Sequence, residues 1–298
     1  MNTFKSTLKI FTFFIFVFAF ASMAQAQATR TWVSGVGDDV NPCSRTAPCK
    51  TFAGAISKTA TNGEINCLDP AGYGAINITK SITIDCEDTQ GSILASLVNG
   101  VIVNGAGVDV RLRGISINGV GNGINCVRVL QASRVTLDEV VCNGFTQHGV
   151  SVENSSGALS LVVWNSSFRS LGGNGINTFV TGTGSASVAV GSSLFAFTNI
   201  ALNFGVSAKG AVHDSTITNN GTGLRADGAT SNLSAQNNQV SHNTTGVFAA
   251  NGANVRIGGN LITGNGTGLS GANIMSFGQN SIDGNTVNGA VSGAASVQ

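Results

Sequence analysis

One pattern returns about every 20 to 27 residues between Val110 and Ala290, and it constrains the fold more than any other feature. It is clearest near the end, where Val255-x-Ile257-x-x-Asn260-x-Ile262-x-x-Asn265 precedes Gly-Thr-Gly-Leu269. Each unit holds two or three short apolar stretches and is too small to bury them alone. Stacking one unit on the next buries the repeated apolar positions as continuous columns. The pattern therefore predicts a solenoid.

Equivalent positions can be aligned across the units. The Ile262 position is held in earlier units by Val240, Ile217, Phe195, Phe168, Cys142 and Ile117. The Leu269 position is held by Val247, Leu224, Leu202, Ile176, Val150 and Ile124. The Asn260 position is held by Asn238, Ser215, Ser193 and Ser166, then by Val140 and Ile115. Because Asn238, Asn260 and Asn280 recur at one corner, we expect their amides to hydrogen-bond from coil to coil.

Secondary structure is expected to be almost entirely β. After residue 60 the apolar residues alternate over short runs broken by Gly and Asn, which is typical of strands. Before that point, Phe52, Ala55 and Ile56 have helical spacing within Lys50–Lys58, so we predict a short helix that caps the open end. Parallel crossovers favour one hand. The predicted fold is a right-handed parallel β-helix, a single-stranded solenoid of roughly 10–11 coils.

The N-terminus has the pattern of an export signal. Lys5 and Lys9 flank the start of an apolar run, and Ala24-Gln25-Ala26 offers a cleavage site before Gln27. The apolar core is about a dozen residues, shorter than the roughly 20 of a membrane span, although a membrane anchor is the alternative. We predict a signal peptide at 1–26, an N-terminal cap at 27–63 and the β-helix at 64–298, with a secreted or periplasmic product that has no membrane span.

Composition limits the partners. Only 10% of the residues are charged and the formal net charge is +1, so nothing favours nucleic acid as a partner. The six cysteines of an exported chain permit three disulfides, in any of 15 pairings. The most local pair is Cys43–Cys49; the other pairings stay open, and Cys142 also fits as a small buried apolar residue. No CxxC spacing occurs, so no metal site is predicted.

Several segments resemble a known family. The segments Trp32-Val-Ser-Gly, Asn41-Pro-Cys, Pro48-Cys-Lys-Thr-Phe-Ala-Gly-Ala-Ile56 and Leu68-Asp-Pro-Ala-Gly-Tyr-Gly74 look like the start of bacterial exported right-handed β-helix repeat proteins, in the pectin-lyase-like superfamily. The later Gly-Thr-Gly-Leu coils resemble the generic β-helix repeat. The resemblance implies the fold over nearly all of the mature chain. It implies no single activity, because the superfamily mixes lyases, hydrolases, epimerases and adhesins.

The known catalytic motifs of that superfamily are not matched. Its lyases use a carboxylate cluster for calcium with an Arg or Lys base, and its hydrolases use Asp on neighbouring coils with Gly-His-Gly and Arg-x-Lys. This chain lacks Arg-x-Lys, and its nearest His motif is Gln147-His148-Gly149. The position of His148 is shared by Asn122, Asn174, Thr222, Thr245 and Thr267, which favours a structural corner over catalysis. No cofactor is predicted, and calcium is expected only if the protein is a lyase.

The alignment brings five other residues together. Arg113, Asp138 and Trp164 fall in one outward column, and Glu139 and Asn165 fall in the next. They predict a sugar-binding patch with the indole as a stacking platform, or a pair of carboxylates acting as acid and base. The alternative is a solvated ion pair beside an exposed Trp. The catalytic candidates are Arg113, Asp138, Glu139 and His148.

A second outward column is polar and suits saccharide hydroxyls, although any exposed neutral strand carries similar residues. It contains Asn125, Ser151, Asn177, Asn203, Arg225, Phe248 and Ser270. The ligand-binding candidates are therefore Trp164, Asn165, Asn125 and Asn177.

Three functions stay open at this point. The favoured one is an exported β-helix without catalysis that binds or scaffolds extracellular polysaccharide or another surface component. The second is a polysaccharide lyase, hydrolase or epimerase with an atypical site, so whether the protein is an enzyme is undecided. The third is a structural or adhesive rod without a small ligand. Neither the glycan nor the oligomeric state follows from the sequence.

Overall fold

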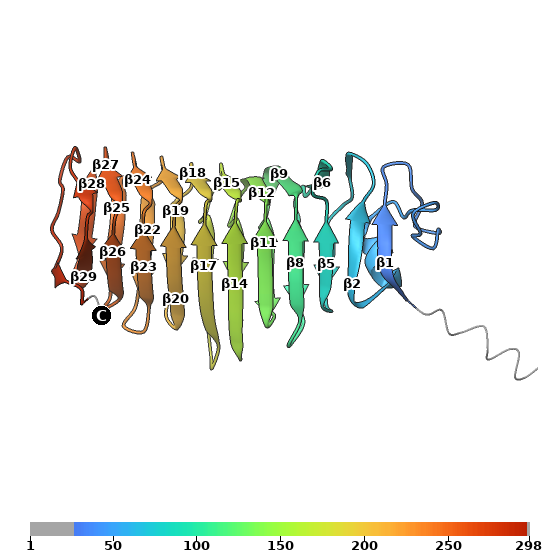
Figure 1. Ribbon diagram of the computed structural model, residues 1–298, viewed down its shortest axis with the longest axis horizontal. Coiled ribbons are helices and arrows are strands. Elements are labelled where there is room, and N and C mark those ends of the chain that lie inside the picture. Colours follow the sequence, from blue (N-terminus) through green and yellow to red (C-terminus); the bar gives the residue numbers. More distant parts are fainter. Residues whose placement is uncertain (1–26, 297–298) are drawn as a thin grey trace, which may run out of the picture.

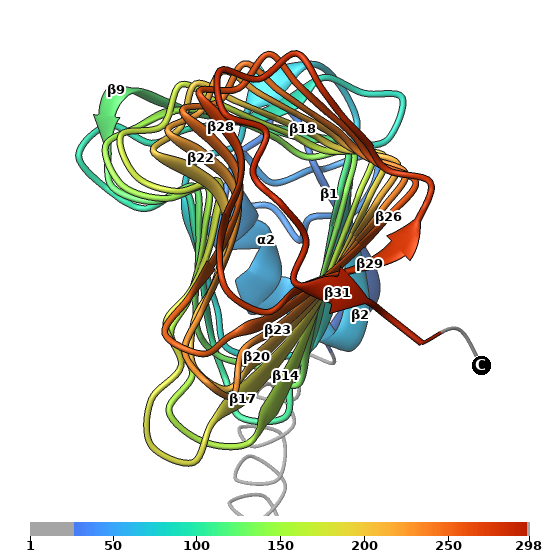
Figure 2. The ribbon, with the colours of Figure 1, turned by 90° about the vertical axis from the view of Figure 1, so that its left-hand side faces the viewer.

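A computed structural model describes residues 27–296, so the predicted signal peptide at 1–26 lies outside the described residues. The chain winds into a parallel β-helix of about ten turns, and three sheets run along its length. Figure 1 shows the strands stacked in chain order along the long axis, and Figure 2 looks along that axis from the C-terminal end. The solenoid predicted from the repeat is confirmed.

Each complete coil contributes one strand to each sheet, the end coils contribute fewer, and neighbouring strands pair in parallel. The twelve-stranded sheet contains β1 (Ala28–Val33), β2 (Thr59–Cys67), β5 (Ile82–Asp85), β8 (Asp109–Arg113), β11 (Arg134–Asp138), β14 (Ala158–Trp164), β17 (Ser185–Gly191), β20 (Ala208–His213), β23 (Asn232–Gln236), β26 (Asn254–Gly258), β29 (Ile274–Gly278) and β31 (Gly293–Ala294). The strand β1 thus belongs to the solenoid, although it lies in the range expected as the cap.

The ten-stranded sheet contains β3 (Ala71–Gly72), β6 (Gly91–Leu94), β9 (Ile115–Gly123), β12 (Val141–Phe145), β15 (Ser167–Arg169), β18 (Leu194–Ala196), β21 (Thr216–Thr218), β24 (Gln239–Ser241), β27 (Leu261–Thr263) and β30 (Ser281–Ile282). The nine-stranded sheet contains β4 (Ile76–Ile78), β7 (Val101–Asn104), β10 (Val127–Gln131), β13 (Val150–Val152), β16 (Ile176–Thr178), β19 (Ile200–Phe204), β22 (Thr222–Asp227), β25 (Thr245–Ala250) and β28 (Thr267–Gly271).

The aligned apolar positions form the core. The register confirms the whole Ile262 column, which runs through Ile117, Cys142, Phe168, Phe195, Ile217, Val240 and Ile262. All seven side chains are buried, and the rings of Phe168 and Phe195 stack at 5.0 Å between centroids. The inward-facing residues of the three sheets together form one continuous core. A single repeat is too small to bury its apolar residues, so the core forms only when the repeats stack.

The Leu269 column departs from the prediction in one coil. Val150 pairs with Val127, not with Ile124, while the remaining positions agree. The coil is longer than its neighbours because β9 continues through Val120 and Gly121, which both adopt left-handed backbone angles. The register after this turn is therefore three residues later than predicted.

The predicted asparagine ladder is present. The side chain of Asn238 donates to Oδ1 of Asn260, and Asn260 donates to Asn280, each at 3.0 Å. A second ladder, which the sequence analysis did not identify, runs through Asn220, Asn243, Asn265 and Asn285. Both ladders satisfy backbone N–H groups at corners of the solenoid where no strand partner exists.

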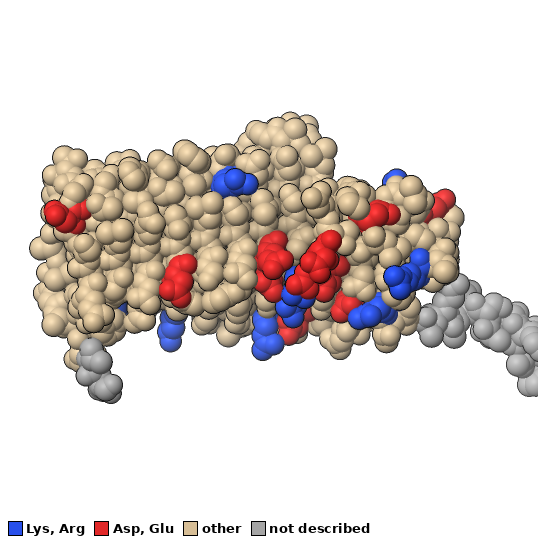
Figure 3. Space-filling model, turned by 45° about the horizontal axis from the view of Figure 1, so that its top comes forward, with Lys and Arg blue, Asp and Glu red and all other residues tan. Residues whose placement is uncertain are grey.

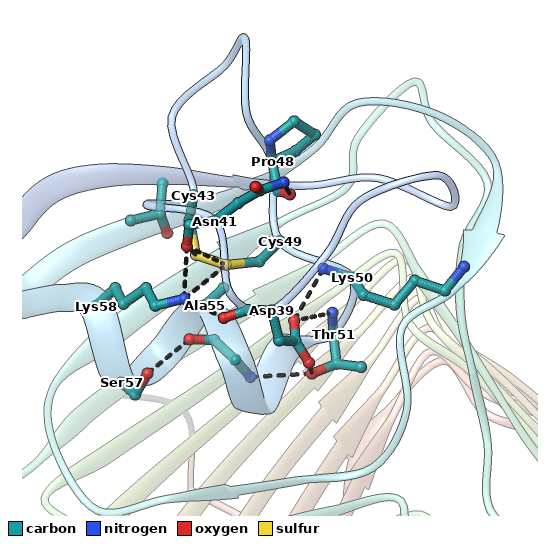
Figure 4. The surroundings of a disulfide bond; sticks show 12 residues. Asp39, Asn41, Cys43, Pro48, Cys49, Lys50, Thr51, Ala55, Ser57 and Lys58 are labelled. Atoms are coloured by element: carbon teal, nitrogen blue, oxygen red, sulfur yellow. Dashed lines mark hydrogen bonds between the residues drawn. A yellow bond between two sulfur atoms is a disulfide. The ribbon is translucent and has the colours of Figure 1, made fainter.

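The helix α2 (Phe52–Lys58) lies at the N-terminal end of the solenoid, where a capping helix was predicted. Thr51 caps it by accepting from Gly54 N, and Phe52 and Ala55 are buried. Figure 4 shows the loop beside it, closed by the disulfide Cys43–Cys49, which is the pairing that the sequence analysis expected. The ammonium group of Lys58 donates to the Asn41 carbonyl at 2.5 Å and so ties the end of the helix to this loop.

Two further disulfides join Cys67 to Cys86 and Cys126 to Cys142. Cys142 occupies the buried Ile262 column, as expected for a small buried apolar residue, and it is also disulfide-bonded. The bond links a corner of the nine-stranded sheet to the ten-stranded sheet across the core.

Candidate functional site

The first candidate site is the outward column of the twelve-stranded sheet. The register places Arg113, Asp138 and Trp164 on adjacent strands. Glu139 and Asn165 follow at the corner, where their φ angles of 55° and 48° are left-handed. This corner breaks the alternation of the strand, so Asp138 and Glu139 can both reach the surface.

The charged part of this column is an ion-pair network. The Arg113 guanidinium faces three carboxylates: Asp85 at 3.8 Å, Asp138 at 3.6 Å, and Glu87. Arg111 also contacts Asp138, at 3.1 Å. Figure 3 shows acidic and basic side chains gathered over this part of the surface, whereas most of the view is uncharged. These carboxylates face a guanidinium, so they do not fit a calcium site.

Trp164 does not join that network. Its ring lies over Gly191, because a Cβ built on that glycine would come within 2.0 Å of the indole. The ring centroid is 5.3 Å from that of His213, one strand further on. The five residues predicted as one patch therefore divide into an ionic cluster around Arg113 and an aromatic cluster around Trp164.

Two open hollows follow the corner between the twelve- and ten-stranded sheets. One, of about 540 Å³, is lined by Glu139 together with residues of the loop that contains Asp88. The other, of about 510 Å³, is lined by Asn165, Ser192 and Asp214 among others. Arg113, Asp138 and Trp164 line neither hollow, so the concave part of this face lies one column away from the predicted patch.

His148 is part of a corner ladder. Asn125 Oδ1 accepts from the backbone N–H of His148 at 3.0 Å, and His148 Nδ1 accepts from the backbone N–H of Asn174 at 2.9 Å. A neutral imidazole that accepts at Nδ1 carries its proton on Nε2. Burial lowers the pKa of His148, against an opposing effect of Glu153. The ring is thus held neutral as a structural acceptor. Asn125, not Asn122, is its neighbour in the column.

The second candidate site is the outward column of the nine-stranded sheet. The shift of three residues places Arg128 beside Ser151, where Asn125 was predicted. Asn125 is instead buried in the ladder and cannot contact a ligand. From Ser151 onward the prediction agrees with the register. The column runs through Asn77, Ile102, Arg128, Ser151, Asn177, Asn203, Arg225, Phe248 and Ser270.

Paired charges occur at two places in this column. Arg128 binds Glu153 through two nitrogens, at 3.0 and 2.8 Å, and Ser151 donates to the same carboxylate. Burial alone would raise the pKa of Glu153, but the hydrogen bonds from Arg128 and Ser151 outweigh it, so the pKa is lowered. Arg225 contacts Asp227 at 2.5 Å and lies 5.6 Å from the ring centroid of Phe248.

Two amides lie between these pairs. Asn177 Oδ1 accepts from Asn203 Nδ2 at 2.9 Å and from Asn174 Nδ2 at 2.8 Å. These bonds fix the amide orientation. The Asn203 Oδ1 atom is buried without a hydrogen-bond partner among the described residues. Figure 2 shows turns protruding on both sides of this sheet, near β9 on one side and beyond β14 and β17 on the other.

Sequence reasoning missed Arg128 and Glu153 because the longer β9 coil displaced the alignment. The register continues the columns of Trp164 and Asn165 to His213 and Asp214, which were not among the predicted site residues. The usable signal was the single Gly191 between two aromatic residues of one column. A glycine there leaves room for a ring to lie flat on the sheet.

Two features are absent from residues 27–296. No cluster of three or more His, Cys, Asp or Glu side chains is placed to hold a metal ion. No helix in this part of the chain has the length and apolar character needed to cross a membrane.

The comparisons with known proteins agree on the fold. A family model described as a right-handed β-helix region matches residues 99–287. The crystal structure of pectate lyase Pel9A is similar with a TM-score of 0.68 and 15% identity, covering 90% of this chain and 81% of that one. The complex of XylC with xylose is similar with a TM-score of 0.60 and 8% identity, covering 84% and 67%. No curated protein sequence matches. At these identities the structural likeness establishes the fold alone.

Proposed function

The chain belongs to the right-handed β-helix family, and on that premise we propose that it binds a neutral, extended polysaccharide along the outer face of its nine-stranded sheet, without cleaving it. The observation that carries the proposal is the register of polar side chains on consecutive coils. Arg128, Asn177, Asn203 and Arg225 are half-buried and can be reached, whereas Ser151 is buried and acts through its hydrogen bond to Glu153. The coils are spaced by about 4.8 Å, so the column offers a regular series of donors and acceptors to a repeating polymer.

The charges of this column favour a neutral ligand. Arg128 is paired with Glu153 and Arg225 with Asp227, so each guanidinium is neutralised by its own carboxylate. A polyanion would have to compete with these pairs, whereas a neutral sugar can donate hydroxyls to the carboxylates and accept from the guanidinium edges. The Phe248 ring adds an apolar surface beside Arg225.

The same pairing favours binding over hydrolysis. A general acid has to hold a proton near neutral pH, which requires a raised carboxyl pKa. The pKa of Glu153 is lowered instead, through Arg128 and Ser151. His148 holds its Nδ1 lone pair in a backbone hydrogen bond, so this atom is not free to accept a substrate proton.

The three disulfides support a role outside the reducing cytoplasm, where such bonds persist. We therefore place this binding in the extracellular or periplasmic space. Scaffolding of surface polysaccharide is the corresponding biological role.

The test uses calorimetric titration of the mature protein with xylohexaose, cellohexaose and an oligogalacturonate. We expect binding of a neutral hexasaccharide with little dependence on salt. The double variant Asn177→Ala/Asn203→Ala should lose the affinity that a hexasaccharide has beyond that of a single sugar unit. Gln236→Ala, an exposed amide on the twelve-stranded sheet, is the matched control. Release of reducing ends or unsaturated products would overturn the non-catalytic proposal. If none of the three glycans binds, the proposal fails, and the remaining function is a structural or adhesive rod without a small ligand.

A further inference from the structure

We propose a second carbohydrate site at the corner between the twelve- and ten-stranded sheets, where Trp164 stacks against one pyranose ring and the hollow beside it binds the hydroxyls. The hollow is the one lined by Asn165, Ser192 and Asp214. This site shares no residue with the nine-stranded sheet, so it does not depend on the function proposed above. Its ligand class is a single neutral sugar unit.

The platform is the exposed indole. Trp164 is 39% exposed, and Gly191 on the next strand allows its ring to lie on the sheet. Any side chain at that glycine would collide with the indole, since even a Cβ would approach to 2.0 Å. A large apolar ring held in this way on a rigid strand presents its face to solvent at little cost in entropy.

Two polar side chains, His213 and Asp214, lie beside the indole of Trp164. His213 lies 5.3 Å from Trp164 between ring centroids, at an interplanar angle of 51°. Its Nδ1 atom is 2.9 Å from Asp214 Oδ2, which fixes the orientation of both side chains. The Asp214 carboxylate keeps a second oxygen for a sugar hydroxyl, and it also lines the hollow.

An unpartnered polar atom lies beside the hollow, beneath its surface. Ser167 Oγ is buried and has no hydrogen-bond partner among the described residues, and Ser167 lines this hollow. Buried polar groups are normally paired, so this unmet hydrogen bond fits an ordered water beneath the surface that a sugar would contact. Asn165 and Ser192, both exposed, add an amide and a hydroxyl around it.

The two proposed carbohydrate sites lie on different sides of the solenoid. Figure 2 places the nine-stranded sheet, with β22 and β28, on one side of the solenoid and the twelve-stranded sheet, with β26, on the other. Two sites on different sides of a rigid rod cannot easily bind one glycan segment together. They can bind two chains, and such bivalent engagement raises the retention of a cross-linked network.

The test follows indole fluorescence during titration with methyl β-xylopyranoside and methyl β-glucopyranoside. The protein contains two Trp, so the background variant is Trp32→Phe, which leaves Trp164 as the reporter. We expect a saturable change in emission with at least one glycoside. Gly191→Ala should weaken that binding by about two- to tenfold, because it displaces the platform.

Gly258→Ala is the matched control, since Gly258 lies in the same column without a tryptophan over it. Binding of both glycosides is also measured by NMR in Trp164→Ala, which carries no indole reporter there. Loss of the sugar-induced shifts around His213 and Asp214 in that variant supports the site.

Unchanged shifts in Trp164→Ala, or no saturable response to either glycoside in the parent protein, would overturn the proposal. Circular dichroism checks that each variant remains folded. The Asn177→Ala/Asn203→Ala double variant should leave this signal intact, so failure of one site is distinguishable from failure of the other.

Discussion

His148 Nδ1 accepts a hydrogen bond from the Asn174 backbone N–H at 2.9 Å and thereby does the work of an asparagine side-chain oxygen. One coil earlier, Asn125 Oδ1 accepts from the His148 backbone N–H, and before that Asn99 Oδ1 accepts from Asn125. A titratable ring has replaced an amide within a ladder that requires an acceptor. Protonation of Nδ1 would remove that acceptor and leave the Asn174 N–H unpaired.

This relationship predicts an acid-sensitive step in stability. Burial holds the pKa of His148 below its ordinary value of about 6.5, so below that pH the unfolded chain binds more protons than the folded one. Stability should fall as the pH drops below about 6.5, until the folded-state pKa is passed. His148→Asn keeps an acceptor in the ladder and should remove this step. Urea unfolding at about pH 7.5 and about pH 5.5 measures it, and equal pH dependence in the two proteins would contradict the assignment.

The second asparagine ladder predicts a large effect from one amide. Asn243 Oδ1 accepts from both the backbone and side chain of Asn220, and its own amide donates to the Ile217 carbonyl. Asn243→Ala leaves buried groups unpaired, so it should cost about 1–3 kcal/mol of unfolding free energy. Asn77→Ala removes an exposed amide and should change it by less than about 0.5 kcal/mol. Similar melting temperatures for the two variants would argue against a structural role for the ladder.

Most of the core could be predicted because stacked coils repeat one set of steric demands. The Ile262 column and the Asn238–Asn260–Asn280 ladder follow directly from the spacing, and the structure has both. The alignment failed where one coil lengthened. Val120 adopts a φ of 56°, which a β-branched residue rarely does, so no local signal marked the extra turn.

The candidate sites were harder to predict because side-chain direction does not follow from column membership. Arg113 and Trp164 are two strands apart in one column, yet Arg113 turns toward Glu87 and Trp164 turns toward His213. Charge pairing and the space above Gly191 decide those directions, and both depend on neighbours from other coils. Arg128 was missed for a different reason, because the longer β9 coil shifts the register by three residues.

The disulfide between Cys126 and Cys142 is expected to stabilise the middle of the solenoid. It closes a loop with a sequence separation of 16, whereas Cys43–Cys49 closes one of only 6. Constraint of the unfolded chain grows with loop length and is worth about 3 kcal/mol for a loop of about 15 residues. The variant Cys126→Ala/Cys142→Ala should therefore lose more stability than Cys43→Ala/Cys49→Ala. Denaturant unfolding of both variants under oxidising conditions checks the order, and the reverse order would contradict it.

Phe204 predicts a steric requirement on the neighbouring strand. Its ring occupies the space above Gly210, where a Cβ would lie 2.6 Å from two ring atoms. The strands on either side place Val188 and Leu233 at that inward position, so glycine is present because the phenyl group fills the gap. Gly210→Ala should destabilise the protein by about 1–3 kcal/mol through overpacking.

Gly72→Ala is the control for this effect, because only Ser92 Oγ lies near its added Cβ, at 3.8 Å. A smaller partner should relieve the strain, so Phe204→Leu/Gly210→Ala is expected to be more stable than the sum of its single changes allows. A double-mutant cycle from chemical denaturation measures that coupling. Additive effects would mean that the ring moves aside freely, and that the core at this coil is not closely packed.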